Sequence, residues 1–344
     1  MNVFIAVAVF GLLILAHELG HFVAAKLSGI AVPEFAVGFG PRLGGVKVRE
    51  TTYNLRLFPV GGFVRMAGTH PDELDAPDGF ARRPVIYRLG VVLAGPLMNF
   101  VLAVLAFFVI FAVVGVFVPV GTAVSEVVPG SPAEAAGLRA GDTVLAVDGR
   151  PLAAWAELVG YVQERPGKEV KLRVQRDGAV HDLVLIPVAS PDRGGKGFIG
   201  VAPLTRLQRL GLLESVRMAF TQLVGLIMFW GRSISLILFR QHPLEVAGPV
   251  GITQLISEAS KLGLANLLYF TGVLSANVGL LNLLPIPALD GSRLAFLAWE
   301  GVRGKPVDPN KENFIHFIGL MVLFLLIIMV TYRDLLRLVT PGQG

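Results

Sequence analysis

The sequence predicts a polytopic α-helical membrane protein with four transmembrane helices, an inserted α+β domain and a membrane-associated β-hairpin region. Of the 344 residues, 53% are hydrophobic and only 16% are charged. The hydrophobic residues gather in uncharged runs long enough to cross a bilayer, which takes about 20 residues. Between two of these runs lies a long segment in which apolar and polar residues alternate, as in the strands of a soluble domain.

The first predicted span, residues 1–28, contains the pattern His-Glu-x-x-His. On a helix, positions i and i+4 share a face, so His17 and His21 can reach one metal ion. Glu18 can lean over the same ion without ligating it. Two His ligands and a Glu general base at this spacing are typical of zinc proteases. A charged group in hydrocarbon costs about 3 kcal/mol, so a functional site is favoured over a chance match.

A catalytic zinc ion takes three protein ligands and keeps one position open. The best candidate for the third ligand is Asp290, because 28 uncharged residues separate it from Lys261. These residues predict a third span over 262–290 that carries Asp290 at its C-terminal end. The alternative is an interfacial helix cap, which is disfavoured because Pro285 and Pro287 already break the helix before Asp290.

Residues 29–88 predict a cytoplasmic loop with membrane-associated β-hairpins, because apolar and polar residues alternate between Gly and Pro. Such a sheet can offer an edge to an extended substrate strand, or it can simply cover the zinc helix.

Residues 89–118 predict the second span, and Asn99 within it needs a polar partner. Gly95 permits close approach of another backbone, and Pro96 follows it directly. These three residues are candidates for substrate binding, with helix packing as the alternative for Asn99.

The topology of the C-terminal half follows from the zinc site. If His17, His21 and Asp290 share an ion, the first and third spans run in the same direction. The stretch 218–239 therefore does not cross the bilayer, although its composition also allows a fifth span. The remaining predictions are surface-lying amphipathic helices over 204–260, a cytoplasmic loop over 291–313 and a fourth span over 314–338. His316, at the start of that span, is interpreted as an interfacial residue.

Charge sets the predicted orientation. Residues 26–88 hold nine Lys and Arg against six Asp and Glu, and residues 291–313 hold four Lys and Arg. By the positive-inside rule both segments are cytoplasmic, which places the zinc site toward the cytoplasmic leaflet. The net charge of +5 is explained by orientation and lipid contact, without a nucleic-acid partner. With no Cys, the chain has neither disulfides nor thiolate metal ligands.

Residues 122–188 look like a PDZ domain, and the run Ala-Gly-Leu-x-x-Gly-Asp over 136–142 is typical of the bacterial kind. PDZ domains bind peptide C-termini by strand addition. The alternative is a steric plug without peptide affinity.

Together, His17-Glu18-x-x-His21, Gly95-Pro96-x-x-Asn99, an inserted PDZ domain and Asn282-x-x-Pro-x-Pro-x-Leu-Asp290-Gly resemble the site-2 protease family of intramembrane zinc metalloproteases. The similarity is greatest to the bacterial regulator-of-sigma-E protease (RseP) branch and covers nearly the whole chain. One departure is that the best-known member of that branch has two tandem PDZ domains, whereas this chain has room for one.

The resemblance implies that His17, His21 and Asp290 ligate Zn²⁺ and that Glu18 is the general base. It also implies that Asn282 is catalytic and stabilises the oxyanion. The implied substrates are single-span membrane proteins, namely trimmed anti-sigma factors or remnant signal peptides. The implied location is the bacterial cytoplasmic (inner) membrane, with the PDZ domain outside. No oligomeric state is indicated.

Two other functions use the same features. A zinc transporter or scaffold needs the ligands but has no specific need for Glu18. An anchored PDZ adaptor needs the inserted domain but not the zinc site.

Overall fold

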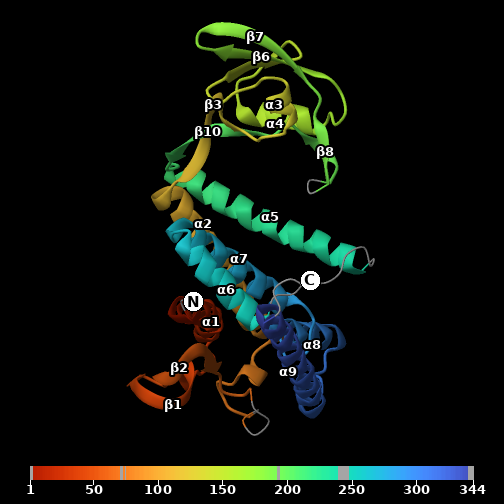
Figure 1. Ribbon diagram of the computed structural model, residues 1–344. Helices are drawn as coiled ribbons and strands as arrows, with labels where there is room; N and C mark the ends of the chain where they lie inside the picture. The colour runs from red at the N-terminus through yellow and green to blue at the C-terminus, as the bar shows by residue number, and fades with distance from the viewer. Residues whose placement is uncertain (1–2, 70–72, 74, 192–193, 239–247, 340–344) are drawn as a thin grey trace. The chain divides into compact units, whose positions relative to one another are not determined.

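The computed structural model describes residues 3–69, 73, 75–191, 194–238 and 248–339 of the chain. The protein divides into two compact units, one formed by Met1–Val114 with Gly211–Gly344 and the other by Gly115–Leu210. The first unit is mainly helical and contains one β-hairpin, and the second is an α+β unit (Figure 1).

The elements of the first unit are α1 (Val3–Leu27), β1 (Glu34–Val48), β2 (Thr51–Arg65), η2 (Phe80–Arg82), α2 (Val85–Val109), the π-helical turn η3 (Ile110–Val114), α5 (Leu212–Leu238), α6 (Pro249–Lys261), α7 (Leu264–Leu283), α8 (Asp290–Arg303) and α9 (Pro309–Val339). Five of the described helices are long and apolar enough to cross a membrane: α1, α2 with η3, α5, α7 and α9. The additional candidate beyond the four predicted is α5, over Leu212–Ser233. The four-span count therefore stays a prediction.

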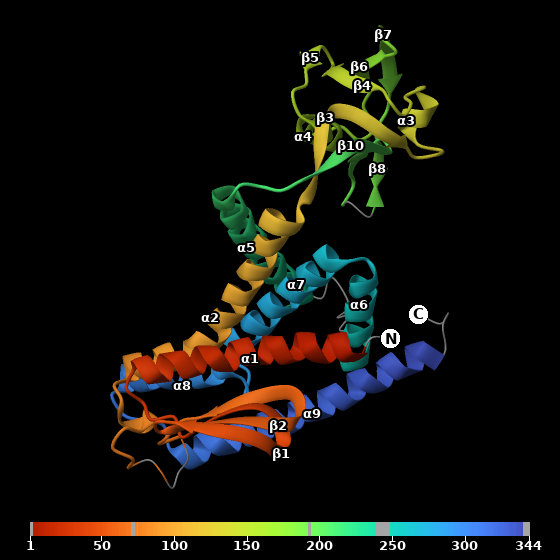
Figure 2. The same ribbon diagram turned by 90° about the vertical axis from the view of Figure 1, so that its left-hand side faces the viewer.

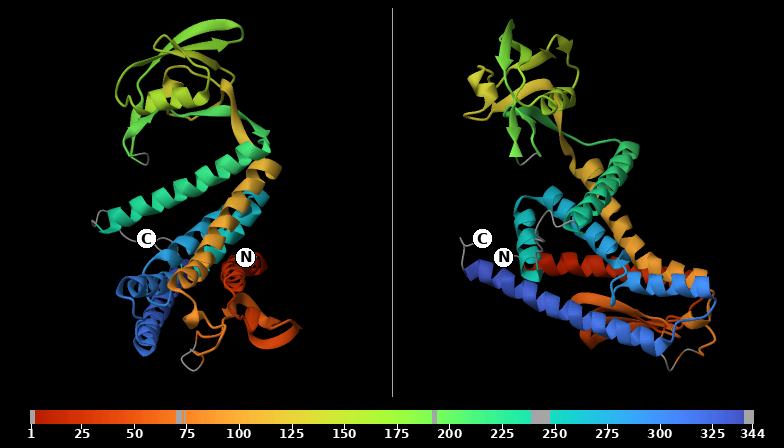
Figure 3. Two further views of the ribbon diagram at one scale, coloured as in Figure 1. Left: turned by 180° about the vertical axis from the view of Figure 1, so that it is seen from behind. Right: turned by 90° about the vertical axis from the view of Figure 1, so that its right-hand side faces the viewer.

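Helices α1, α2 and α7 form the centre of this unit (Figure 2). Gly20 allows the close crossing of α1 and α2, since a Cβ on Gly20 would lie 2.2 Å from the carbonyl oxygen of Ala94. Helix α5 packs against α2 and α7 (Figure 3). Two polar bonds join it to α7: Gln222 Nε2 donates to Tyr269 Oη at 3.2 Å, and the Trp230 indole donates to Asn277 Oδ1 at 2.5 Å.

Helix α6 packs one face against α1, and the surface-lying helices predicted within 204–260 stay a prediction. Ile256 is fully buried in a cluster with Ala6 and Leu13 of α1. The N-terminus of α6 is held by Asp334 of α9, which accepts the N–H of Gly251 at 2.8 Å. A carboxylate at this end of a helix is favoured by the helix dipole.

The third span ends earlier than predicted. Helix α7 stops at Leu283, and Asp290 is the first residue of α8 rather than the last of the span. The predicted loop 291–313 thus contains a helix. Its charged residues concealed the helical pattern, yet Leu297 is buried, and Glu300 accepts two hydrogen bonds from the Arg88 guanidinium of α2, one of them 3.0 Å long.

The predicted hairpin region, 29–88, contains β1 and β2 and ends in the first turn of α2. The two strands pair in more than one register: residues 34–37 lie opposite both 52–55 and 62–65, and residues 44–48 lie opposite 51–55. Strands β1 and β2 pair antiparallel, with Val48 opposite Thr51 at the tip. Arg49 takes the left-handed conformation there, with φ of 53°. The hairpin packs on α1 through Phe22, whose ring centroid is 5.2 Å from that of Phe35.

The inserted unit contains β3 (Val116–Val127), α3 (Pro132–Ala135), β4 (Thr143–Val147), β5 (Arg150–Pro151), α4 (Trp155–Gln163), β6 (Val170–Arg176), β7 (Ala179–Leu185), β8 (Val188–Ser190), β9 (Lys196–Phe198) and β10 (Val201–Gln208). The main sheet has the order β10-β3-β4-β6-β7, with β5 beside β4, and β8 pairs with β9.

The unit is longer than the predicted range of 122–188. Strand β10 pairs with β3 as far as Gln208 opposite Val116, and Ile199 belongs to the buried core. Residues 204–208 are therefore strand rather than surface helix, and the second span, predicted to reach 118, gives way to β3 at Val116. The Pro- and Gly-rich segment over 186–197 resembles a linker in sequence, which hid β8 and β9, which overlap it, and β10, which follows it.

A buried ion pair stabilises the inserted unit from within. Asp142 is fully buried and accepts two 2.7 Å hydrogen bonds from Arg176, as well as the N–H of Arg139 at 2.8 Å. The Arg176 guanidinium holds the pKa of Asp142 below its usual range.

The substitution Asp142→Asn is expected to destabilise the inserted unit by roughly 2–3 kcal/mol, the size of a hydrogen bond to a charged group. Because the folded-state pKa of Asp142 is lowered, the ionised carboxylate stabilises the unit at neutral pH. This stabilisation is lost only below about pH 4, as the pH falls through the folded pKa. Hydrogen exchange of β4 and β6 amides in the full chain measures the difference. The control is Asp182→Asn, since the Asp182–Arg173 pair is exposed and should contribute little.

Candidate metal centre

Three side chains that are distant in sequence meet in the first unit. His17 and His21 come from α1, and Asp290 comes from the first turn of α8. Asp290 Oδ2 lies 3.0 Å from His17 Nε2 and 3.2 Å from His21 Nε2, and the two Nε2 atoms are 3.2 Å apart. They form the one metal-ligand group of three or more His, Cys, Asp or Glu side chains among the described residues.

The outer nitrogen of each imidazole is already bonded. His21 Nδ1 lies 2.8 Å from the carbonyl oxygen of Val91, which can only accept, so Nδ1 carries the proton. His17 Nδ1 lies 3.0 Å from Asn99 Oδ1, and the amide is oriented by its own donation to Leu13 O at 3.4 Å. Both Nε2 atoms therefore turn lone pairs toward Asp290. Such outer bonds are how proteins orient metal-binding imidazoles.

The centre fits a tetrahedral metal ion. Asp290 Oδ2 is buried and has no hydrogen-bond partner among the described residues. Two imidazole lone pairs and a carboxylate oxygen in mutual contact repel one another unless a cation lies between them. Zinc ligands at about 2.0–2.1 Å in a tetrahedral arrangement are about 3.3 Å apart. The observed separations of 3.0–3.2 Å match this spacing.

Gly95 of α2 provides the space for the two imidazoles. A Cβ on Gly95 would lie 2.4 Å from His21 Nε2 and 2.9 Å from His17 Cε1. Any larger residue would occupy the volume in which the ligand atoms meet.

Glu18 lies between α1 and the hairpin. Its carboxylate lies near the backbone N–H of Val64, and a Cβ on Gly62 would be in ordinary contact with Glu18 Cγ at 3.7 Å. Strand β2 therefore holds Glu18 beside the His17 and His21 rings without adding it to the ligand group.

The predicted substrate-binding residues have another position. Gly95, Pro96 and Asn99 are buried in the packing of α2, and the side chain of Asn99 is occupied by His17 and Leu13. These contacts support the packing alternative for Asn99, and substrate binding by the three residues stays a prediction. Asn282 lies in the last turn of α7, and its amide makes no hydrogen bond to the described part of the chain.

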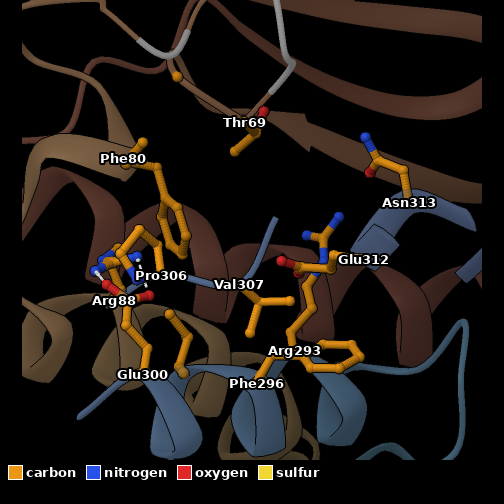
Figure 4. A pocket seen from close by; sticks show the side chains of 13 residues that line it. Thr69, Phe80, Arg88, Arg293, Phe296, Glu300, Pro306, Val307, Glu312 and Asn313 are labelled. Atoms are coloured by element: carbon orange, nitrogen blue, oxygen red, sulfur yellow. Dashed lines mark hydrogen bonds and ion pairs between the residues drawn. The ribbon is translucent and has the colours of Figure 1, made fainter. Parts of the chain in front are cut away.

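The Val91 carbonyl was not predicted as part of the centre. A backbone carbonyl is present at every residue, so the sequence carries no signal for it. The pocket of Figure 4 is also separate from the centre. It is a cavity of about 270 Å³ lined by residues of α2, α8, α9 and the segments before them, among them Arg88, Glu300 and Glu312, and by none of the three ligand candidates.

The substitution Gly95→Ala is expected to weaken zinc binding at least about tenfold, because the new methyl group displaces the His21 ring. The matched control is Gly90→Ala on the same helix, where a Cβ meets open space. Zinc competition with a chelator on the two purified variants measures the effect. Equal zinc affinity in both would contradict the assigned packing.

Comparison with known proteins identifies the family. The model of peptidase family M50 matches residues 5–326. The zinc metalloprotease RasP of Shouchella clausii is 33% identical, over 98% of this chain and 100% of that protein. The regulator of sigma-W protease RasP of Bacillus subtilis is 32% identical, over 96% of this chain and 97% of that protein.

A smaller likeness concerns a solved structure, the PDZ domain of the SdrC-like protein from Listeria monocytogenes. It covers 24% of this chain and 87% of that structure, with 25% identity and a TM-score of 0.23.

The near-complete matches agree with the apolar helices and with the convergence of two His and one Asp. The chain belongs to peptidase family M50, the site-2 proteases, and is a multi-pass membrane zinc metalloprotease.

Proposed function

We propose that the protein hydrolyses peptide bonds within the transmembrane segments of single-span membrane proteins. The observation that carries this proposal is the meeting of His17, His21 and Asp290 at helices whose outer surfaces suit lipid. A metal centre between membrane-spanning helices would meet substrates that are themselves embedded in the bilayer. The described chain also keeps Glu18 beside the centre but outside the ligand group.

In the proposed mechanism, His17, His21 and Asp290 hold zinc. When bound there, zinc would supply Lewis-acid polarisation of the scissile carbonyl and would make water a stronger acid. Glu18 takes a proton from the attacking water and later donates it to the leaving amine. Asn282 donates its amide N–H to the developing oxyanion. The Val91 carbonyl orients the His21 ring.

The proposed substrates are anti-sigma factors trimmed by an earlier cleavage, or remnant signal peptides. The name of the Bacillus subtilis relative, regulator of sigma-W protease, supports the first class. The proposed location is the bacterial cytoplasmic membrane, with the metal centre toward the cytoplasmic leaflet. Membrane lipids are then the neighbours of the exposed apolar residues of α9, such as Leu325 and Phe324.

The inserted unit is proposed to be a PDZ domain that lies outside the membrane and excludes substrates with large ectodomains. A shallow groove of about 50 Å³ between α4 and the segment from β9 to β10 is the place where a peptide strand would bind. Trp155 and Leu158 line it from α4, and Ile199 lines it from the opposite side.

Glu18→Gln is expected to keep zinc and to lower cleavage of a single-span substrate at least about 100-fold, because the amide cannot accept the proton. Zinc content and cleavage are measured on the purified protein in parallel. Glu126→Gln, on the exposed side of β3, is the control and should cleave normally. If the protein were a zinc transporter or scaffold, Glu18→Gln would have no specific effect on its function. Unchanged cleavage in Glu18→Gln would refute the role of Glu18 as general base.

Because the chain has no Cys, single introduced cysteines can map its orientation. In intact cells, a membrane-impermeant maleimide is expected to label Gln175→Cys in β6 and not Lys305→Cys between α8 and α9. Both positions are exposed in the protein. Labelling with the opposite pattern would overturn the proposed sidedness and, with it, the exclusion of large ectodomains.

A further inference from the structure

The segment between α7 and α8 determines where Asp290 lies. It begins at Leu284 and contains Pro285 and Pro287, so it cannot continue the α7 helix. Ala288, two residues before Asp290, has φ of +78°, a left-handed conformation that residues with a Cβ rarely adopt. Such a conformation persists only where neighbouring groups enforce it.

Two positions on one face of α9 enforce it. His316 Nδ1 accepts the backbone N–H of Ala288 at 3.2 Å. One turn later, Gly319 leaves space for Pro287, since a Cβ on Gly319 would lie 2.3 Å from Pro287 Cβ. Residues at i and i+3 of a helix are neighbours on its surface. Pro287 and Ala288, which are consecutive in the turn, therefore contact two neighbouring positions on the surface of α9.

The environment of the His316 ring is informative. Since Nδ1 accepts a hydrogen bond, the ring proton is on Nε2, which is buried and has no hydrogen-bond partner in the described part of the chain. The nearest carboxylate oxygen, on Glu312, is 3.8 Å away, beyond hydrogen-bond range. Phe296 meets the ring edge-on at 6.0 Å between centroids. Phe296 and Glu312 also line the cavity of Figure 4.

This arrangement excludes a simpler role. His316 is not free to ligate metal through Nδ1, because Ala288 occupies that atom. Its other nitrogen is buried without a hydrogen-bond partner among the described residues, so solvent does not orient the ring. In the part of the chain that the structure describes, the hydrogen bond of the ring is directed at the turn before Asp290.

We infer that His316 is a positioning residue for the metal centre: it fixes the Ala288 turn and thereby sets the Asp290 carboxylate against His17 and His21. Gly319 supports the same turn by its lack of a side chain. The inference rests on the proposed ligand role of Asp290, and the contact is made through the backbone of Ala288 rather than through any ligand atom.

The test compares three variants of the full-length protein. His316→Leu removes the acceptor and is expected to weaken zinc binding about 10- to 100-fold, the usual effect of losing a group that orients a ligand. His316→Asn places an amide oxygen where Nδ1 was and should stay within about threefold of wild type. In the double variant His316→Leu with Ala288→Gly, glycine adopts the left-handed turn unaided, so zinc affinity should recover in part.

Chelator competition gives the zinc dissociation constants. The visible absorption of the cobalt-loaded protein reports separately on ligand geometry and is expected to change in His316→Leu alone. The control is Phe317→Leu, the next residue on α9, which is 58% exposed. Thermal unfolding of the metal-free variants shows whether each one folds.

The outcomes distinguish failure of the His316 positioning role from failure of the proposed metal centre. Wild-type zinc affinity in His316→Leu, or equal losses in His316→Leu and His316→Asn, would overturn the positioning role. If His316→Leu does not fold, the zinc affinities of His316→Asn and of the double variant His316→Leu with Ala288→Gly are compared instead. Near-wild-type affinity in His316→Asn together with weaker affinity in the double variant supports the positioning role, and equal losses in both overturn it. If the wild-type protein binds no zinc, or Asp290→Asn binds it normally, the proposed metal centre itself fails.

Discussion

The structure depends on the mutual repulsion of three electron-pair donors that are forced into contact. Two imidazole nitrogens and one carboxylate oxygen lie 3.0–3.2 Å from one another, and the imidazole protons are on the opposite ring nitrogens. In an apolar environment this repulsion is poorly screened, because the local dielectric constant is low. The fold therefore contains an unfavourable cluster that becomes favourable when a divalent cation enters it.

The surrounding helices are organised to maintain that cluster. Close helix crossings at Gly20 and Gly95 remove side chains from the places where the rings must lie. The Asn99 amide and the Val91 carbonyl fix the orientation of the rings. The third donor comes from a different helix and is reached through a turn that holds Ala288 in an unfavourable conformation. Stability is given up at these positions, and a defined ligand geometry is obtained.

Much of the site was predictable because its chemistry is unusual for its surroundings. A carboxylate and two imidazoles within an apolar run draw attention to Glu18, His17 and His21, and the long uncharged segment isolates Asp290. Asn99 was recognised as needing a partner, yet the sequence cannot tell whether that partner is a substrate or a neighbouring imidazole. Helix packing determines which side chains meet, and the spacing of apolar residues along one helix does not show how that helix packs against another.

The errors have the same origin. Helix α8 was missed because its charged residues are paired in the folded protein, as Arg88 with Glu300, and so do not mark a solvated loop. The last strands of the inserted unit were missed because β10 pairs with β3, which lies far away in sequence. His316 received no role because its partner is the backbone of Ala288, which no side-chain pattern reveals.

The pairing of Val116 with Gln208 has an evolutionary consequence. The chain enters and leaves the inserted unit through two neighbouring strands, whose Cα atoms across the ladder are only about 5 Å apart. A module attached through such a narrow two-stranded stem can be lost, doubled or exchanged without changing the spacing of the helices to which it is joined. Proteins with this helical core are thus free to exchange the inserted module while their metal centre stays constant.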